Sequence, residues 1–386
     1  MGPLKLSADA QAILLICSSL GLPREAADGL TPLRQDEWNE LARSIADSEL
    51  ARPGALLEGE LGAVAPALGL APALTERLRR LLSRGGQLAI ELERLASVGI
   101  WVLTRADEDY PSGLRQKLGG KAPVVLFGAG DRAALGAGVL AVVGSRALDE
   151  AGTSFADALG RRCARDGLAV VSGAAKGADR VSMTGALEAG GAAIGVLADS
   201  LEATIVSRET RRWIAEGSLT LVTPFHPRAR FTVGTAMQRN KSIYGLARYA
   251  LVVASGQESG GTWAGAVEDL KAGWVPLFVR TGPAVPPGNM DLLARGALEF
   301  PDEMLADIDD IEAWLQERVR QALPANREDP TMPPGAATGN ERGRRPSGPH
   351  PTLSQRGRAF LEKPGPSLPD ARAVGMGAVQ GRLFEP

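Results

Sequence analysis

The sequence predicts an α/β fold in which an extended, Rossmann-like, doubly wound and mostly parallel sheet follows a small all-helical domain. Residues 1–98 show amphipathic helical patterns without a strand-like run, whereas residues 99–323 alternate short apolar runs with helix-length segments. Apolar strands that alternate with helices are typical of a parallel sheet covered on both faces, because each crossover must return over the sheet. Residues 324–386 differ from both regions.

The helical domain rests on patterns such as DEWNELARSIADSEL at 36–50 and ALTERLRRLLSRGGQLAIELERLASVG at 73–99. Their apolar residues recur at helical spacing. Prolines separate the patterns, and a proline ends or starts a helix. These prolines are Pro23, Pro53, Pro66 and Pro72.

The sheet domain rests on eight apolar runs that we expect to form strands. They span residues 99–104, 124–128, 139–145, 168–173, 192–198, 219–223, 250–255 and 275–279. Beyond them, 20 of the last 63 residues are Pro or Gly, and apolar periodicity vanishes. Such a segment cannot bury enough surface to offset its ordering entropy, so we expect a disordered tail.

Composition narrows the function classes. The net charge of −2 gives no global attraction to nucleic acid, so anion binding must come from a local basic patch. Cys17 and Cys163 stand in apolar helical stretches and are expected to be small buried thiols; two cysteines and two histidines exclude a disulfide framework or a zinc set. Without a signal-peptide pattern or a membrane-length apolar run, a cytoplasmic protein is expected.

The turn after residues 139–143 combines small residues with a guanidinium. Gly144 and Ser145 let the backbone approach a ligand, and Arg146 can grip a phosphate through two hydrogen bonds. The alternative is a structural salt bridge from Arg146 to a helix that begins near Asp149. The position at the end of a buried strand favours phosphate binding.

A second small-residue turn follows residues 168–171. Ser172, Gly173 and Gly177 precede a helix, and Lys176 is expected to face the same crevice as Arg146. The alternative is a tight turn with Lys176 in solvent. In both interpretations Asp179 is expected to cap the helix that follows.

Two further candidates complete the predicted crevice. Arg239, Asn240 and Lys241 follow the basic, aromatic loop 225–231; because adjacent helical residues point about 100° apart, only two of the three can line one site. The turn after residues 250–255 offers backbone N–H groups to an anion; its residues are Gly260, Gly261 and Thr262. The alternative for residues 239–241 is a solvated helix face. The alternative for residues 260–262 is a tight turn without a ligand.

Catalytic signatures are missing. The sequence has neither GxGxxG after the first strand nor GxxxxGK[ST], which disfavours a dinucleotide site or an NTPase loop. His226 is not paired with an evident nucleophile and is expected to be a loop residue that stacks or hydrogen-bonds. We therefore expect a binding protein without cofactor or metal rather than an enzyme.

The motifs AVVGSR, LAVVSGAAKGAD and QRNKSIYGLARYALVVAS, in this order, resemble the DNA-processing protein A family (DprA, also called Smf), within the superfamily of the LOG proteins. The resemblance runs from Glu91 to near Val279. It implies a sterile-alpha-motif (SAM)-like helical domain before the Rossmann-like domain. It also implies sequence-independent binding of single-stranded DNA (ssDNA), a homodimer, and loading of the RecA recombinase during natural transformation. Arg146, Lys176, Arg239 and Lys241 fall on the family's DNA-contacting positions.

The chain departs from the family pattern in three places. It reads HPRARFTVGTAMQ where relatives carry an Asn-Phe-Pro run, ESGGT where they tend to read RSGS, and a Pro/Gly-rich tail where many have a winged-helix domain. Glu258 thus stands where a cation is expected and would repel a nearby phosphate. One interpretation of these departures is that the chain is a divergent paralogue.

Two alternative functions use the same crevice. One is a LOG-like nucleoside-monophosphate phosphoribohydrolase, but its PGGxGTxxE motif is incomplete here, with Gly265 in place of the acidic residue. The other is a sensor that binds a small nucleotide, for example in phage defence.

Overall fold

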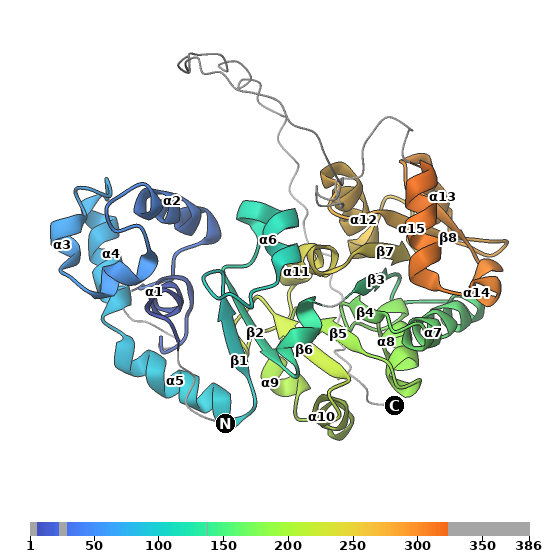
Figure 1. The fold of residues 1–386 in the computed structure, drawn as a ribbon, viewed down its shortest axis with the longest axis horizontal. Coiled ribbons are helices and arrows are strands. Elements are labelled where there is room, and N and C mark those ends of the chain that lie inside the picture. The colour runs from blue at the N-terminus through green and yellow to red at the C-terminus, as the bar shows by residue number, and fades with distance from the viewer. Residues whose placement is uncertain (1–5, 23–28, 137, 323–386) are drawn as a thin grey trace, which may run out of the picture. The chain divides into compact units, whose positions relative to one another are not determined.

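The computed structural model describes residues 6–22, 29–136 and 138–322. In the first hundred residues these are helices: α1 Ala8–Cys17, α2 Gln35–Ala46, the 3-10 helix η1 Pro53–Leu57, α3 Leu61–Val64, α4 Pro72–Leu82 and α5 Gly85–Ser97. The predicted helical region is confirmed over the residues described (Figure 1). Its assignment as a separate SAM-like domain of residues 1–98 stays a prediction, and the predicted disordered tail, residues 324–386, lies outside the described residues.

A nine-stranded mixed sheet follows, in the order β1-β2-β6-β5-β4-β3-β7-β8-β9. The strands are β1 Trp101–Thr104, β2 Val125–Ala129, β3 Val139–Val143, β4 Ala169–Ser172, β5 Ala193–Val196, β6 Leu219–Thr223, β7 Tyr249–Val252, β8 Leu277–Thr281 and β9 Leu298–Pro301. Only the pairs β1–β2 and β2–β6 are antiparallel. The α/β class and all eight predicted strands are confirmed, and β9 is a strand that the sequence did not predict.

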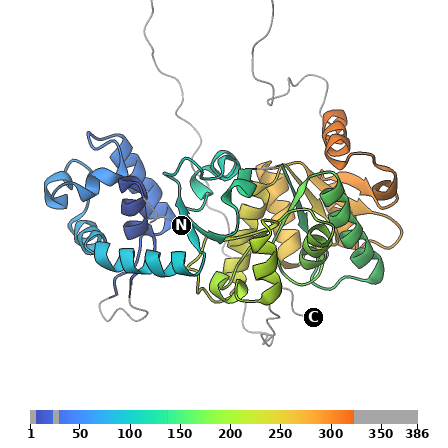
Figure 2. The same ribbon diagram turned by 60° about the horizontal axis from the view of Figure 1, so that its bottom comes forward.

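Helices cover both faces of this sheet (Figure 2). One face packs against α7 Glu150–Arg165, α8 Ala178–Glu188, α9 Leu201–Thr204, α10 Arg208–Ala215, α14 Met304–Asp307 and α15 Ile311–Ala322. The other packs against α6 Ser112–Leu118, α11 Val233–Leu246, α12 Gly260–Ala272 and α13 Pro287–Ala294. Short 3-10 turns, η2 Gly119–Lys121 and η3 Arg132–Gly136, join some of the elements.

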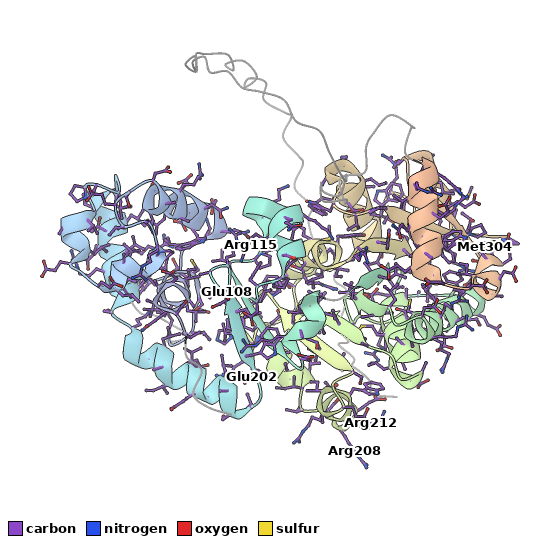
Figure 3. The ribbon with its side chains drawn as sticks, viewed as in Figure 1. Glu108, Arg115, Glu202, Arg208, Arg212 and Met304 are labelled. Carbon is purple, nitrogen blue, oxygen red and sulfur yellow. The ribbon has the colours of Figure 1, made fainter. Side chains whose placement is uncertain are left out.

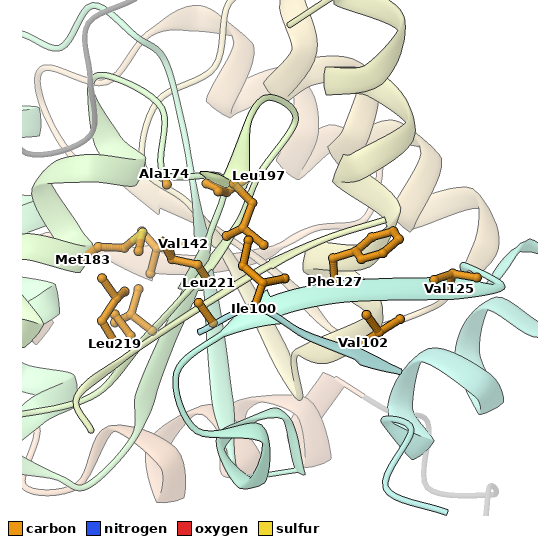
Figure 4. Close-up of a cluster of buried hydrophobic side chains, with 14 of the residues drawn as sticks. Ile100, Val102, Val125, Phe127, Val142, Ala174, Met183, Leu197, Leu219 and Leu221 are labelled. Atoms are coloured by element: carbon orange, nitrogen blue, oxygen red, sulfur yellow. The ribbon is translucent and has the colours of Figure 1, made fainter. Parts of the chain in front are cut away.

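Strand residues alternate between the two cores, as the period of a strand requires. In β3, Leu140 and Val142 join the core beneath α7 and α8, whereas Ala141 and Val143 join the core beneath α11 and α12. Figure 4 shows part of the first of these cores, in which Val142 of β3 and Leu221 of β6 are labelled. The burial of both faces explains the continuous apolar runs in the sequence.

Polar contacts tie the helical region to the sheet. Gln35 of α2 donates to the carbonyl of Ala122 at 2.6 Å. Glu202 of α9, labelled in Figure 3, accepts from Arg94 of α5 at 2.6 Å and from Arg228 at 3.0 Å. The turns that follow β6 are therefore anchored to the helical region.

Candidate nucleic-acid interface

The turns after β3 and β4 are in contact at the carboxyl edge of the sheet. The N–H of Ala178 donates to the carbonyl of Ser145 at 3.2 Å. A Cβ on Gly144 would lie 2.5 Å from the Cβ of Ala178, and one on Gly177 would lie 2.1 Å from the carbonyl oxygen of Ser145. Gly177 also has a φ of 84°, a left-handed conformation that favours glycine. The small residues of both motifs are required for this close approach.

The two turns lie at the switch point of the sheet. From β3 the chain continues through β4, β5 and β6 on one side, and through β7, β8 and β9 on the other. The N–H of Ser145 donates to the carbonyl of Ala254 at 2.8 Å, which fixes the first turn to the end of β7. Ligands of doubly wound folds bind in the crevice at such a point.

Arg239 is the central cation of this crevice. Its side chain comes from α11, is 5% exposed, and lies against Gly173, where a Cβ would stand 1.5 Å from Nη1. Neither Nε nor Nη1 has a hydrogen-bond partner among the described residues. A buried guanidinium with unpartnered N–H groups is costly unless a ligand accepts from them.

Two carboxylates, of buried Asp179 and half-buried Asp199, balance the charge of Arg239. Burial raises the pKa of Asp179 to about 6, although the positive charge of Arg239 and the N–H groups of Ala175 and Gly144 oppose the shift. Burial also raises the pKa of Asp199, which follows β5. The prediction that Asp179 caps its helix is wrong, because Gly177 is the N-cap residue and Asp179 lies buried in the first turn of α8.

Arg146 and Lys176 stand at the solvent side of the two turns, and both are exposed. The guanidinium of Arg146 lies 5.4 Å from the centre of the Phe231 ring. Arg146 makes no ion pair with Asp149, whose carboxylate instead caps α7 by accepting from the N–H of Gly152 at 2.7 Å. Throughout the part of the chain that the structure describes, no carboxylate pairs with Lys176.

Asn240 and Lys241 diverge from Arg239, as their helical spacing requires. Asn240 donates to the carbonyl of Gly261 at 3.2 Å and so joins α11 to the first turn of α12. Lys241 instead forms an ion pair of 3.2 Å with Glu268. The structure thus brings Arg239 and Asn240 to the crevice and partners Lys241 elsewhere.

The first turn of α12 offers exposed backbone at the same edge. Gly260 and Gly261 are exposed, and Thr262 is half-buried. Glu258, with a φ of 49°, is 3.4 Å from the guanidinium of Arg295. The guanidinium of Arg295 therefore offsets part of the negative charge of Glu258, which we expected to repel a phosphate.

The remaining candidates have structural roles. His226 accepts from the N–H of Arg228 at 3.1 Å, as expected of a loop residue. Cys163 is buried, and burial raises its pKa to about 12; burial also raises the pKa of half-buried Cys17. Among the described residues there is no cluster of His, Cys, Asp and Glu that could hold a metal ion, and no helix long and apolar enough to cross a membrane.

Sequence reasoning missed two residues of the crevice. Asp199 follows a predicted strand, as Ser145 and Gly173 do, and that position was a usable signal. Phe231 closes the loop 225–231, but nothing in its spacing indicates that its ring lies beside Arg146.

Part of the chain is similar in sequence to known DNA-processing proteins. The sequence profile of the family described as DNA recombination-mediator protein A matches residues 101–273. A DNA processing protein DprA of Mycobacterium tuberculosis is 30% identical over 246 residues, which is 59% of this chain and 60% of that protein. Protein Smf of Escherichia coli is 32% identical over 203 residues, 50% of this chain and 53% of that protein.

Residues 101–273 of the chain are thus similar to the DprA/Smf family. The profile match begins at β1 and ends just after α12, so it contains every residue of the predicted crevice. The X-ray structure of DprA from Streptococcus pneumoniae has the same fold, with a TM-score of 0.57, 21% identity, and coverage of 79% of this chain and 99% of that one. The chain spans only about half to three-fifths of the curated DprA and Smf proteins that it matches.

Proposed function

We propose that this protein binds ssDNA without sequence preference along the crevice between the ends of β3, β4 and β7. The observation that carries the proposal is the Arg239 guanidinium, buried on Gly173 with two unpartnered nitrogens. Exposed Arg146 and Lys176 flank it and supply the charge that a phosphodiester backbone needs. The backbone of Gly173 and Gly177 and the first turn of α12 border the same path.

Binding rather than hydrolysis is supported by the start of α12. The position at which LOG-like hydrolases carry their acidic residue is Gly265, and a Cβ there would lie 3.3 Å from Nδ2 of Asn240. A longer carboxylate side chain would displace the contact that joins α11 to α12. Glycosidic cleavage requires a carboxylate as acid or base, and this position cannot supply one.

A length series of labelled oligonucleotides tests the proposal. A groove that follows the backbone gains affinity steadily with length, whereas a mononucleotide sensor gains nothing beyond one or two nucleotides. We expect a steady gain, measured by fluorescence anisotropy at fixed salt. A plateau at the dinucleotide would favour the nucleotide sensor instead.

The salt dependence of binding should identify the residues that contact phosphate. Each neutralised phosphate contributes about −0.7 to the slope of log affinity against log salt for single strands. Arg146→Ala and Lys176→Ala are each expected to reduce the slope by about that amount. Lys241→Ala is the matched control, because its ammonium group is already paired with Glu268, and its effect should be smaller.

Equal slopes for the wild type and for both Arg146→Ala and Lys176→Ala would rule out this crevice as the DNA path.

Similarity to the DprA/Smf family supports a finer proposal. We propose that the protein acts in the cytoplasm as a homodimer that loads RecA on ssDNA, with no chemical step of its own. The test is the rate at which RecA displaces single-strand-binding protein from a long ssDNA in the presence of the chain. An Arg239→Gln variant should give no acceleration. If this variant accelerates the displacement as much as the wild type does, RecA loading does not depend on the crevice.

A further inference from the structure

A second cationic pocket lies on the α7 side of the sheet. It has a volume of about 670 Å³, within the range of roughly 300–1,000 Å³ that is usual for small-molecule sites. One wall is the exposed face of α7, another is α14, and the end of β8 also lines it. It shares no lining residue with the ssDNA crevice. The lining residues used below are Phe155, Ala158, Arg162, Arg280 and Leu305.

Two buried arginines line this pocket. The side chain of Arg280 is 1% exposed and that of Arg162 is 3% exposed. Arg280 donates to Asp302 through Nε at 2.6 Å and through Nη2 at 2.8 Å. Arg162 donates to Asp166 through Nε at 2.6 Å. These ion pairs hold both guanidinium groups in place.

The ion pairs leave three buried nitrogens over: Nη1 of Arg280 and both Nη atoms of Arg162 have no hydrogen-bond partner among the described residues. Carboxylates that neutralise the arginines do not satisfy these N–H groups. Nearly all buried polar groups in native proteins are hydrogen-bonded. These three nitrogens belong to the two arginines that line one cavity, so an acceptor bound there could satisfy them.

We propose that this pocket binds a small molecule that carries a phosphate group. A phosphate has three oxygens that can accept from three separate guanidinium nitrogens, and arginine is the usual partner of phosphate in such geometry. The cavity is larger than a phosphate. Its apolar lining, from Phe155, Ala158 and Leu305, suits a less polar remainder such as a nucleoside. The proposal is independent of the ssDNA-binding function.

The substitution that tests the pocket is Ala158→Glu. Ala158 is exposed and lies four residues before Arg162 on α7, the spacing at which glutamate pairs with arginine along a helix. The new carboxylate would accept from the unpartnered nitrogens and occupy the place of the phosphate. Thr153→Glu is the matched control, because it adds the same charge to an exposed position of α7 outside the pocket lining.

Isothermal titration with inorganic phosphate, adenosine monophosphate and adenosine provides the readout, with an ssDNA titration in parallel. We expect the two phosphate-bearing probes to bind and adenosine not to bind. Ala158→Glu should weaken that binding at least tenfold, and Thr153→Glu should retain it. A Gly173→Ala variant, in which the ssDNA crevice is altered, should also retain it. Affinity for ssDNA should be the same in the wild type and Ala158→Glu.

Two results would overturn the proposal. If phosphate binding disappears in Gly173→Ala and persists in Ala158→Glu, the anion binds in the ssDNA crevice, and water satisfies the three nitrogens of the pocket. If Ala158→Glu weakens ssDNA binding, the pocket belongs to the DNA path and does not serve a small molecule.

Discussion

Replacing Gly173 with alanine is expected to weaken ssDNA binding by about tenfold or more, since hydrogen bonds to charged groups are worth about 1.5–3 kcal/mol each. The added Cβ would stand 1.5 Å from Nη1 and 2.5 Å from Cζ of Arg239, so the guanidinium must leave its position. Gly173 does not have a positive φ, so alanine fits the backbone. Any fall in the melting temperature should therefore come from the displaced guanidinium and not from backbone strain.

The control for this prediction is Gly86→Ala, since a Cβ on Gly86 in α5 has no atom within 4 Å. It should bind ssDNA as the wild type does. Arg239→Gln should lose about as much affinity as Gly173→Ala, and the double variant should lose no more than either, because both changes remove one interaction. Additive losses, measured by fluorescence anisotropy, would mean that Arg239 does not act from its position on Gly173.

The sequence was sufficient to predict the sheet because both of its faces are buried. Strands β3, β4, β5 and β7 are continuous apolar runs that only a covered parallel sheet explains. Strand β9 reads LEFP and has only one fully buried residue, Phe300. An edge strand with an exposed glutamate and a terminal proline does not give the pattern of a buried strand, and so it was not predicted.

The candidate site was predictable as a set of turns but not as a set of contacts. Small residues at 144–145 and 172–173 indicated where the backbone could approach a phosphate. No local pattern could show that Arg239, 66 residues beyond Gly173 in the sequence, lies on it. For the same reason the sequence could not show that Lys241 pairs with Glu268, which lies on a neighbouring helix.

Asp179 was mistaken for a cap because an acidic residue near the start of a helix usually has that role. Gly177 ends the turn with a positive φ and leaves Asp179 inside the first turn of α8, where its carboxylate accepts from two backbone N–H groups of the strand-end turns. Its buried position gives this carboxylate a pH-dependent role that a solvent-facing cap would lack.

The affinity for ssDNA is expected to rise about tenfold as the pH falls from 7 to 5, since a unit charge at several ångströms is worth about 1–2 kcal/mol at an effective dielectric constant near 20. Burial raises the pKa of Asp179 to about 6, so that it loses its charge in this range. The protonated carboxyl group no longer offsets the positive charge of Arg239, so Arg239 binds a phosphate more strongly. Asp199, whose pKa burial also raises, acts in the same direction.

Linkage fixes the sign of the effect on stability. Because folding raises the pKa of Asp179 above its unfolded value, the native state binds more protons than the unfolded state between about pH 4 and pH 6. The free energy of unfolding should therefore fall by roughly 3 kcal/mol as the pH rises through this range. The stabilising contribution is fully present below pH 4 and lost above pH 6.

Asp179→Asn separates these effects from other titrations, because it removes the charge at every pH. Its affinity for ssDNA at pH 7 should approach that of the wild type at pH 5, and its pH dependence should be smaller, with only the contribution of Asp199 left. His226→Gln is the control for the histidine in the loop before α11, and it should keep the wild-type profile. The measurement is anisotropy at constant ionic strength from pH 5 to 8. An unchanged pH profile in Asp179→Asn would show that this carboxylate does not tune Arg239.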